Sequence, residues 1–131
     1  MEAACWSELQ DKVSEALIRH RSLIDVMSKL QDTAARVSRT IAKAATECGC
    51  VEYNIVKQQA PEDASFSQLA KFMETHVKGE LCEDCREALE KEIGRSLFYL
   101  VSLCELMGLA FDSIVEREYQ QVSTLGAFTL A

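Results

Sequence analysis

The feature that most constrains this chain is its shortage of residues that break helices. Between Trp6 and Cys48 there is neither glycine nor proline, and the full 131 residues contain 1 proline and 5 glycines. Sandwiches and barrels built from short strands need frequent turns, and turns are rich in these two residue types. The sequence therefore predicts an all-α fold.

Apolar positions in the first half recur at alternating steps of three and four residues, which is the spacing of one helix face. The pattern predicts one helix over about 7–20 and a longer one over about 23–47, which Gly49 ends as a left-handed residue. In the longer helix the apolar face comprises Met27, Leu30, Ala34, Val37, Ile41, Ala44 and Cys48.

Three more helices are predicted in the second half. The capping-box pair Ser65 and Gln68 precedes a short amphipathic helix that continues through Val77 and stops at Gly79. A long helix over about 83–107 and a final helix after Phe111 follow. Residues 51–56 are the one candidate for a short extended segment. A chain of this length forms one domain, so we expect a single bundle of about five helices.

The charge balance limits the partners of the chain. Lys and Arg number 14 against 21 Asp and Glu, which gives a net charge of -7. Such a surface disfavours binding to nucleic-acid phosphates or anionic lipid. The longest apolar run, 97–111, is shorter than the roughly 20 residues that span a membrane. Because residues 1–8 show no export signal, we expect a cytoplasmic protein with no nucleic-acid or membrane partner.

Four of the 6 cysteines form two close pairs. Cys48-Gly-Cys50 lies at the end of one predicted helix, and Cys82-Glu-Asp-Cys85 begins another about 30 residues later. This layout is typical of a tetrahedral site with four thiolates, as zinc prefers. Two alternatives remain: Cys48 completes the apolar helix face beside three free thiols, or Cys82 and Cys85 form a redox pair.

Two segments resemble the MazG-like all-α nucleoside triphosphate pyrophosphohydrolases. In that family a helix beginning Glu-x-Gly-Asp continues into Phe-Tyr-Leu, then Leu-Gly-Leu and a last helix with a tyrosine, and residues 92–122 have this layout (EIGRSLFYLVSLCELMGLAFDSIVEREYQQV). Residues 29–41 (KLQDTAARVSRTI) lie where the family has Lys-Leu-x-Glu-Glu-x-Gly-Glu-Leu. The resemblance implies one MazG-like helical domain over 1–131, with residues 48–86 as a cysteine-bearing insertion.

The family's chemistry requires a carboxylate cluster, because Mg²⁺ prefers oxygen ligands. Carried over by position, the resemblance gives Asp32 and Glu92 as the surviving acids and places Thr33, Arg36 and Arg95 at the other three positions. A guanidinium repels the cation that those positions would hold. The resemblance therefore implies a degraded magnesium site, and magnesium-dependent hydrolysis is disfavoured.

Arginines at these positions suggest a different chemistry, because guanidinium groups bind phosphate directly. With Arg36, Arg39 and Arg95 as candidates, we predict a non-catalytic MazG-like protein that binds a nucleotide or another anion, or that has a regulatory or structural role. The alternative interpretation is that Arg36 and Arg95 do no more than form ion pairs with Asp32 and Glu92.

Two further functions stay open. One is an active magnesium-dependent pyrophosphohydrolase that uses Asp32, Glu92 and additional carboxylates. The other is a metal or thiol sensor centred on the cysteines. MazG-like proteins usually associate through their long helices, and the apolar positions in 27–48 and 97–109 exceed what one short bundle needs, so we expect a homodimer or a tetramer.

Overall fold

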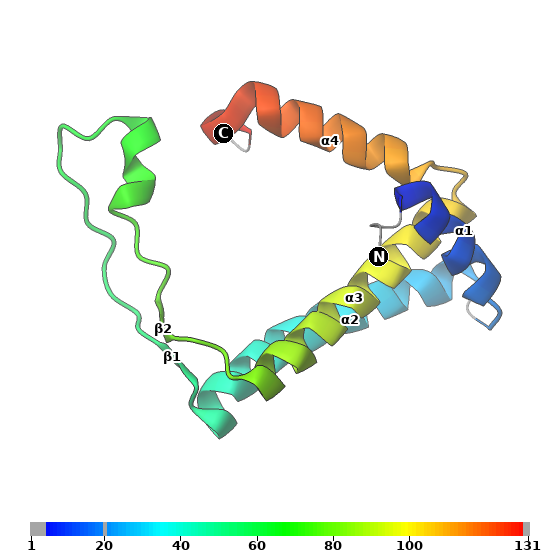
Figure 1. The fold of residues 1–131 in the computed structure, drawn as a ribbon, viewed down its shortest axis with the longest axis horizontal. Helices are drawn as coiled ribbons and strands as arrows, with labels where there is room; N and C mark the ends of the chain where they lie inside the picture. Colours follow the sequence, from blue (N-terminus) through cyan, green and yellow to red (C-terminus); the bar gives the residue numbers. More distant parts are fainter. Residues whose placement is uncertain (1–4, 20, 130–131) are drawn as a thin grey trace.

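Four α-helices make up most of the chain in a computed structural model that describes residues 5–19 and 21–129 (Figure 1). They are α1 (Trp6–Ala16), α2 (Leu23–Lys43), α3 (Glu83–Leu106) and α4 (Phe111–Leu125). Together with a short 3₁₀ helix, Phe66–Lys71, they confirm the predicted all-α class of about five helices.

The longest helices, α2 and α3, lie side by side and antiparallel, and they are the most extensively packed pair in the molecule (Figure 1). After Lys43, α2 widens into a π-helical turn over Ala44–Cys48. Gly49 ends it with φ of 81°, and its N–H donates to the Ala44 carbonyl at 2.8 Å. The predicted glycine terminus is therefore confirmed, because only glycine adopts this left-handed backbone freely.

A hairpin connects α2 to α3. Its strands are β1 (Val51–Tyr53) and β2 (Val77–Gly79), paired antiparallel with Val51 opposite Gly79. Between the strands the chain reaches outward to the 3₁₀ helix and returns (Figure 1). At the far end, the rings of Phe66 and Phe128 stack with centroids 5.0 Å apart, which ties the hairpin tip to the C-terminal end of α4.

The buried core lies at the opposite end of the α2–α3 pair, where α1 and α4 meet α3. It centres on Val13, Val101, Cys104 and Phe111. Cys104 is thus a packing residue of the core. Gln10 holds the α3–α4 junction: its amide nitrogen donates to Glu105 Oε2 at 3.0 Å and to the Leu109 carbonyl at 2.8 Å, and its amide oxygen accepts from the Phe111 N–H at 2.8 Å.

Two predicted helices are shorter than expected. The first stops at Ala16 and not near residue 20, because Leu17 leaves the helical conformation (ψ 80°) and turns its side chain into the interior. The helix predicted to run through Val77 is a six-residue 3₁₀ helix, and Val77 belongs to β2. The Ser65 N–H does donate to Gln68 Oε1, at 3.1 Å, as the capping pair predicts.

Within the described residues, no single helix has the length and apolar character needed to cross a membrane. Helices α3 and α4 pass that test of length and composition only when joined, and they bend by 112° at the break between them.

Candidate functional site

The two predicted cysteine pairs meet where the hairpin joins the helices. Cys48 is the last residue of the π-helical turn, Cys50 precedes β1, Cys82 is the residue before α3 and Cys85 lies in its first turn. All four sulfur atoms lie within 4.8 Å of one another, and no other such group occurs among the residues that the structure describes. The predicted grouping of Cys48, Cys50, Cys82 and Cys85 is thus present.

The spacing of these sulfurs suits a tetrahedral ion. With metal–sulfur bonds of about 2.3 Å, the ligands of a tetrahedral zinc lie about 3.8 Å apart. The Sγ atoms of Cys48 and Cys82, which come from opposite sides of the hairpin, are 3.8 Å apart. A metal ion such as zinc could therefore bind here with little movement of the backbone.

Local backbone geometry holds the cysteines together. The left-handed conformation of Gly49 turns the chain sharply between Cys48 and Cys50. Across the hairpin, Gly79 has φ of 85°, and a Cβ added to it would lie 2.5 Å from the Cys50 carbonyl oxygen. The two halves of the cluster therefore approach through backbone contacts that a larger residue at position 79 would block.

The start of α3 favours a thiolate at Cys82. The Cys85 N–H donates to Cys82 Sγ at 3.4 Å, and the Cys85 thiol donates to the same sulfur. These two hydrogen bonds lower the pKa of Cys82 to about 7. Because its thiol donates to Cys82, the pKa of Cys85 is raised. One negative charge is thus readily placed on the cluster, whereas further charges need a cation to offset their repulsion.

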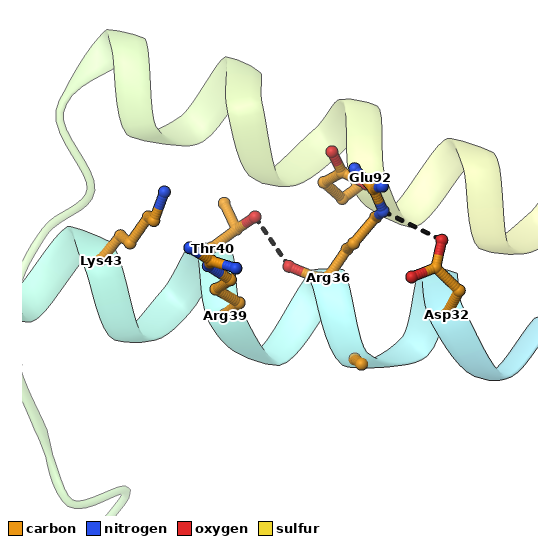
Figure 2. Close-up of a pocket in the computed structure, with 7 residues that line it drawn as sticks. Asp32, Arg36, Arg39, Thr40, Lys43 and Glu92 are labelled. Atoms are coloured by element: carbon orange, nitrogen blue, oxygen red, sulfur yellow. Dashed lines mark hydrogen bonds and ion pairs between the residues drawn. The ribbon is translucent and has the colours of Figure 1, made fainter.

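The predicted acids and arginines lie elsewhere, along the contact between α2 and α3. Asp32, Arg36, Arg39 and Glu92 line one hollow of about 340 Å³, together with Ala35, Thr40 and Lys43. Figure 2 shows Arg36 reaching from α2 toward α3 and Glu92. A neighbouring hollow of about 210 Å³ shares Asp32 and Arg36 and adds Arg95, with Lys29, Thr33, Phe98 and Tyr99. We call these two hollows together the basic groove.

Ion pairs within the basic groove match the simpler alternative. Arg36 Nε lies 3.1 Å from Asp32 Oδ2 (Figure 2), and Arg95 Nη1 lies 3.8 Å from Glu92 Oε1. The Glu92 side chain is only 16% exposed, and its other oxygen has no hydrogen-bond partner among the described residues. Asp32 and Glu92 are therefore each held beside a guanidinium group.

The groove contains two cations that the sequence analysis did not identify. Lys29 and Lys43 extend the row of Arg36 and Arg39 along α2, at spacings of 3, 4 and 7 residues that place all four on one side of the helix. With Arg95, the groove has five cationic side chains against two carboxylates. That spacing was visible in the sequence, but the resemblance covered only the motif positions.

Thr33 differs from the other motif positions. Its side chain is 3% exposed and its hydroxyl donates to the Leu30 carbonyl at 3.0 Å. Val26 is buried as well, although neither residue belongs to the predicted apolar face. Of that face, Ala44 is buried and Leu30, Val37 and Ile41 are half-buried, whereas Met27, Ala34 and Cys48 are exposed. Arg36 and Arg39 are exposed and line the groove.

No protein-family model, curated protein or solved structure matches this chain.

Proposed function

We propose that this protein is a MazG-like helical protein, stabilised by zinc, that binds a phosphate-bearing anion such as a nucleotide in the basic groove without hydrolysing it. The observation that carries the proposal is the charge of the groove, where five cations face two carboxylates in a chain whose net charge is -7. Concentrating positive charge in one hollow of an acidic molecule favours anionic ligands at that position.

The same geometry argues against a magnesium-dependent reaction. Mg²⁺ needs several oxygen ligands around one point, but Asp32 is paired with Arg36 and Glu92 lies beside Arg95. A divalent cation between these acids would be close to two guanidinium groups. Those guanidinium groups can instead bind phosphate oxygens in a fork geometry, which provides anion binding without a metal.

Zinc is the proposed cofactor of the cysteine cluster. Four sulfur ligands that all lie within 4.8 Å of one another, with 3.8 Å between those of Cys48 and Cys82, suit a tetrahedral, closed site, which is typical of structural and not of catalytic zinc. Because two ligands come from each side of the hairpin, the bound ion would fix the end of α2 to the start of α3.

Calorimetric titration with inorganic tripolyphosphate and with ATP, in magnesium-free buffer, tests anion binding. We expect wild-type protein to bind both, and the double variant Arg36→Gln with Arg39→Gln to bind at least tenfold more weakly because two phosphate contacts are lost. Arg86→Gln is the matched control, since this exposed arginine of α3 does not line the groove. Equal binding by all three proteins, or by none, would rule out the groove as the site.

The same protein samples test the alternative function, an active magnesium-dependent pyrophosphohydrolase. Adding Mg²⁺ or Mn²⁺ and measuring pyrophosphate release from ribo- and deoxyribonucleoside triphosphates should give no turnover. Release that disappears in Glu92→Gln would establish the active pyrophosphohydrolase instead.

A metal or thiol sensor is the second candidate, favoured by the exposure of Cys48 beside a readily ionised Cys82. Peroxide would oxidise these two thiolates to one disulfide while it is reduced to water, and the cluster would lose two of its ligands. A sensor releases its zinc at peroxide concentrations that leave Cys5 unmodified, whereas a purely structural site retains the metal.

A further inference from the structure

A further hollow adjoins the basic groove at the end of the α2–α3 pair where α1 lies, and we call it the apolar hollow. Its volume is about 370 Å³, and the residues that line it are Ala16, Leu17, Ile18, Arg19, Phe98 and Tyr99. Phe98 and Tyr99 also line the basic groove. The groove and the apolar hollow therefore share one stretch of α3, and one ligand can contact both.

Apolar side chains dominate the lining of the apolar hollow. Leu17 is 1% exposed, whereas Ile18 beside it is 78% exposed. The rings of Phe98 and Tyr99 meet edge to face, with their centroids 5.1 Å apart. Among the lining residues, only Arg19 and Tyr99 have polar side-chain groups. A pocket that is mostly apolar, with a few polar groups, is typical of sites that hold the organic part of a small molecule.

The backbone beside the apolar hollow uses its donors within the chain. The Leu17 N–H donates to the Val13 carbonyl at 2.9 Å, and the Ile18 N–H donates to the Ala16 carbonyl at 3.0 Å. A nucleobase has several hydrogen-bonding groups along its edges, and contact with Leu17 and Ile18 would leave such groups without partners, which is costly. An alkyl or prenyl chain has no such groups, so it suits this lining better than a base does.

Helix α3 places a charged contact and apolar contacts in sequence along one side. Arg95 precedes Phe98 and Tyr99 by three and four residues, so the three side chains lie on the same side of the helix. Arg95 belongs to the basic groove, and its side chain is half exposed. A ligand with an anionic head and an apolar chain matches this order, because each part meets a surface of complementary character.

We infer that the ligand of the basic groove is a phosphate or diphosphate ester of an apolar alcohol. Its phosphates lie among the cations of the groove, and its chain lies in the apolar hollow against Leu17, Ile18 and Phe98. This inference rests on the proposed function, because it requires the groove to bind phosphate. Covering Ile18 would remove from water an apolar side chain that the folded chain itself leaves exposed.

Calorimetric titration of the full-length protein with methyl diphosphate, geranyl diphosphate and ADP, in magnesium-free buffer, tests this inference. All three ligands are diphosphate esters, and they differ in the organic group. Each methylene removed from water is worth roughly fourfold in affinity. We therefore expect geranyl diphosphate to bind at least about tenfold more tightly than methyl diphosphate, whereas ADP should bind within about threefold of methyl diphosphate.

Variants assign the gain in affinity to the apolar hollow. Ile18→Ser should lower the ratio of geranyl to methyl diphosphate affinity at least about threefold, because it removes apolar contact with the chain. Ile24→Ser is the matched control, since this isoleucine is 75% exposed and lines neither the basic groove nor the apolar hollow. Both substitutions are at exposed positions, and circular dichroism checks that both variants are folded. The double variant Arg36→Gln with Arg39→Gln should weaken all three ligands.

Each contrary result has a distinct meaning. Equal affinities for methyl and geranyl diphosphate would overturn this inference and leave the anion-binding groove in place, whereas binding of none of the three esters would overturn both. A preference for geranyl diphosphate that persists in Ile18→Ser, or that is unaffected by loss of the two arginines, would place the chain elsewhere and overturn the inference. Tighter binding of ADP alone would assign the apolar hollow to a nucleobase and overturn the proposed ligand class.

Discussion

Cys82 combines a helix-capping position with a place in the sulfur cluster. It precedes α3, where unpaired backbone N–H groups favour negative charge, and its Sγ accepts from the Cys85 N–H at 3.4 Å. The same sulfur lies 3.8 Å from Cys48. A residue in this position delivers a thiolate to the cluster at neutral pH, which is the form that metals bind.

Zinc stoichiometry is the first prediction at this scale. Reduced protein should carry one zinc per chain, and Cys82→Ser with Cys85→Ser should lose the metal and lower the melting temperature, because binding energy of a structural ion is folding energy. Elemental analysis and thermal unfolding measure both effects. Cys5→Ser, an exposed cysteine outside the cluster, should change neither. Wild-type protein without a transition metal would contradict the zinc proposal.

The ionisation of Cys82 gives a prediction about pH. Its pKa of about 7 means that, in folded and metal-free protein, Cys82 is mostly thiolate above pH 7 and mostly thiol below it. Its alkylation rate by iodoacetamide should therefore rise to half its maximum near pH 7. In guanidinium chloride, which removes the helix start, the midpoint should move up to the usual value of about 8.5. Peptide mapping of a pH series reports the midpoint, and equal midpoints in both solvents would contradict the helix effect.

Residues of the site could be predicted to different degrees from the sequence. The cysteine cluster followed from local rules, since one pair ends a helix at a glycine and the other begins a helix. The groove was only partly found, because Lys29 and Lys43 join it through packing against α3 and not through a motif. The burial of Thr33 was missed, because the side of α2 that α3 covers depends on the partner helix.

The burial of Thr33 limits which of the acids implied by the family resemblance can be introduced into this chain. Glutamate at position 33 would place a charge inside the α2–α3 contact, which is costly without a partner. Arg36 and Arg95, in contrast, are half exposed. Substituting acids for these two arginines is therefore the less disruptive way to test whether the positions bind a divalent cation.

At the scale of elements, the extents of α2 and α3 and the start of α4 followed from spacing and glycines. The segment between Ser65 and Gly79 did not, because a few residues of apolar spacing are too short to propagate an α-helix that has so little tertiary packing. Val77 instead pairs with Tyr53 as a residue of strand β2. A contact far along the chain thus outweighed the local pattern.

Gly79 is the element-scale prediction, since the hairpin closes on the cluster through it. Gly79→Ala combines a left-handed φ of 85° with a Cβ 2.5 Å from the Cys50 carbonyl oxygen, so we expect a loss of more than about 1 kcal/mol of stability and weaker zinc binding. Gly94→Ala is the matched control, because its position in α3 is open and helical and alanine favours helix there. Chemical denaturation and competition with a zinc chelator compare the two, and equal effects would contradict a role for backbone contact.

Across the whole molecule, the cysteine cluster and the buried core lie at opposite ends of the α2–α3 pair (Figure 1). The core of Val13, Val101, Cys104 and Phe111 is formed by helices alone. The hairpin has little buried apolar surface, and most of its residues between 54 and 80 are exposed. The two ends therefore depend on different interactions, sulfur ligation at one and apolar burial at the other.

Removing zinc should consequently loosen one end and leave the other folded. After chelation, trypsin should cleave faster at Lys57 and Lys71, both exposed on the hairpin, while far-ultraviolet circular dichroism loses little helicity. Mass spectrometry of the digest locates the cuts, and adding zinc back should restore protection. Cooperative loss of all helices on chelation would show that the two ends are not independent.

The pairing of Val51 with Gly79 brings the departing and returning chain together directly beside the cysteines. The Asn54 N–H still donates to the His76 carbonyl at 2.9 Å, so the two chain segments remain joined one step beyond the strands. Loop-closure entropy rises only slowly with loop length. Residues 55–75, which lie beyond these backbone pairs, can consequently be exchanged, shortened or lengthened with small effect on the metal ligands. A reporter peptide can be inserted in this segment.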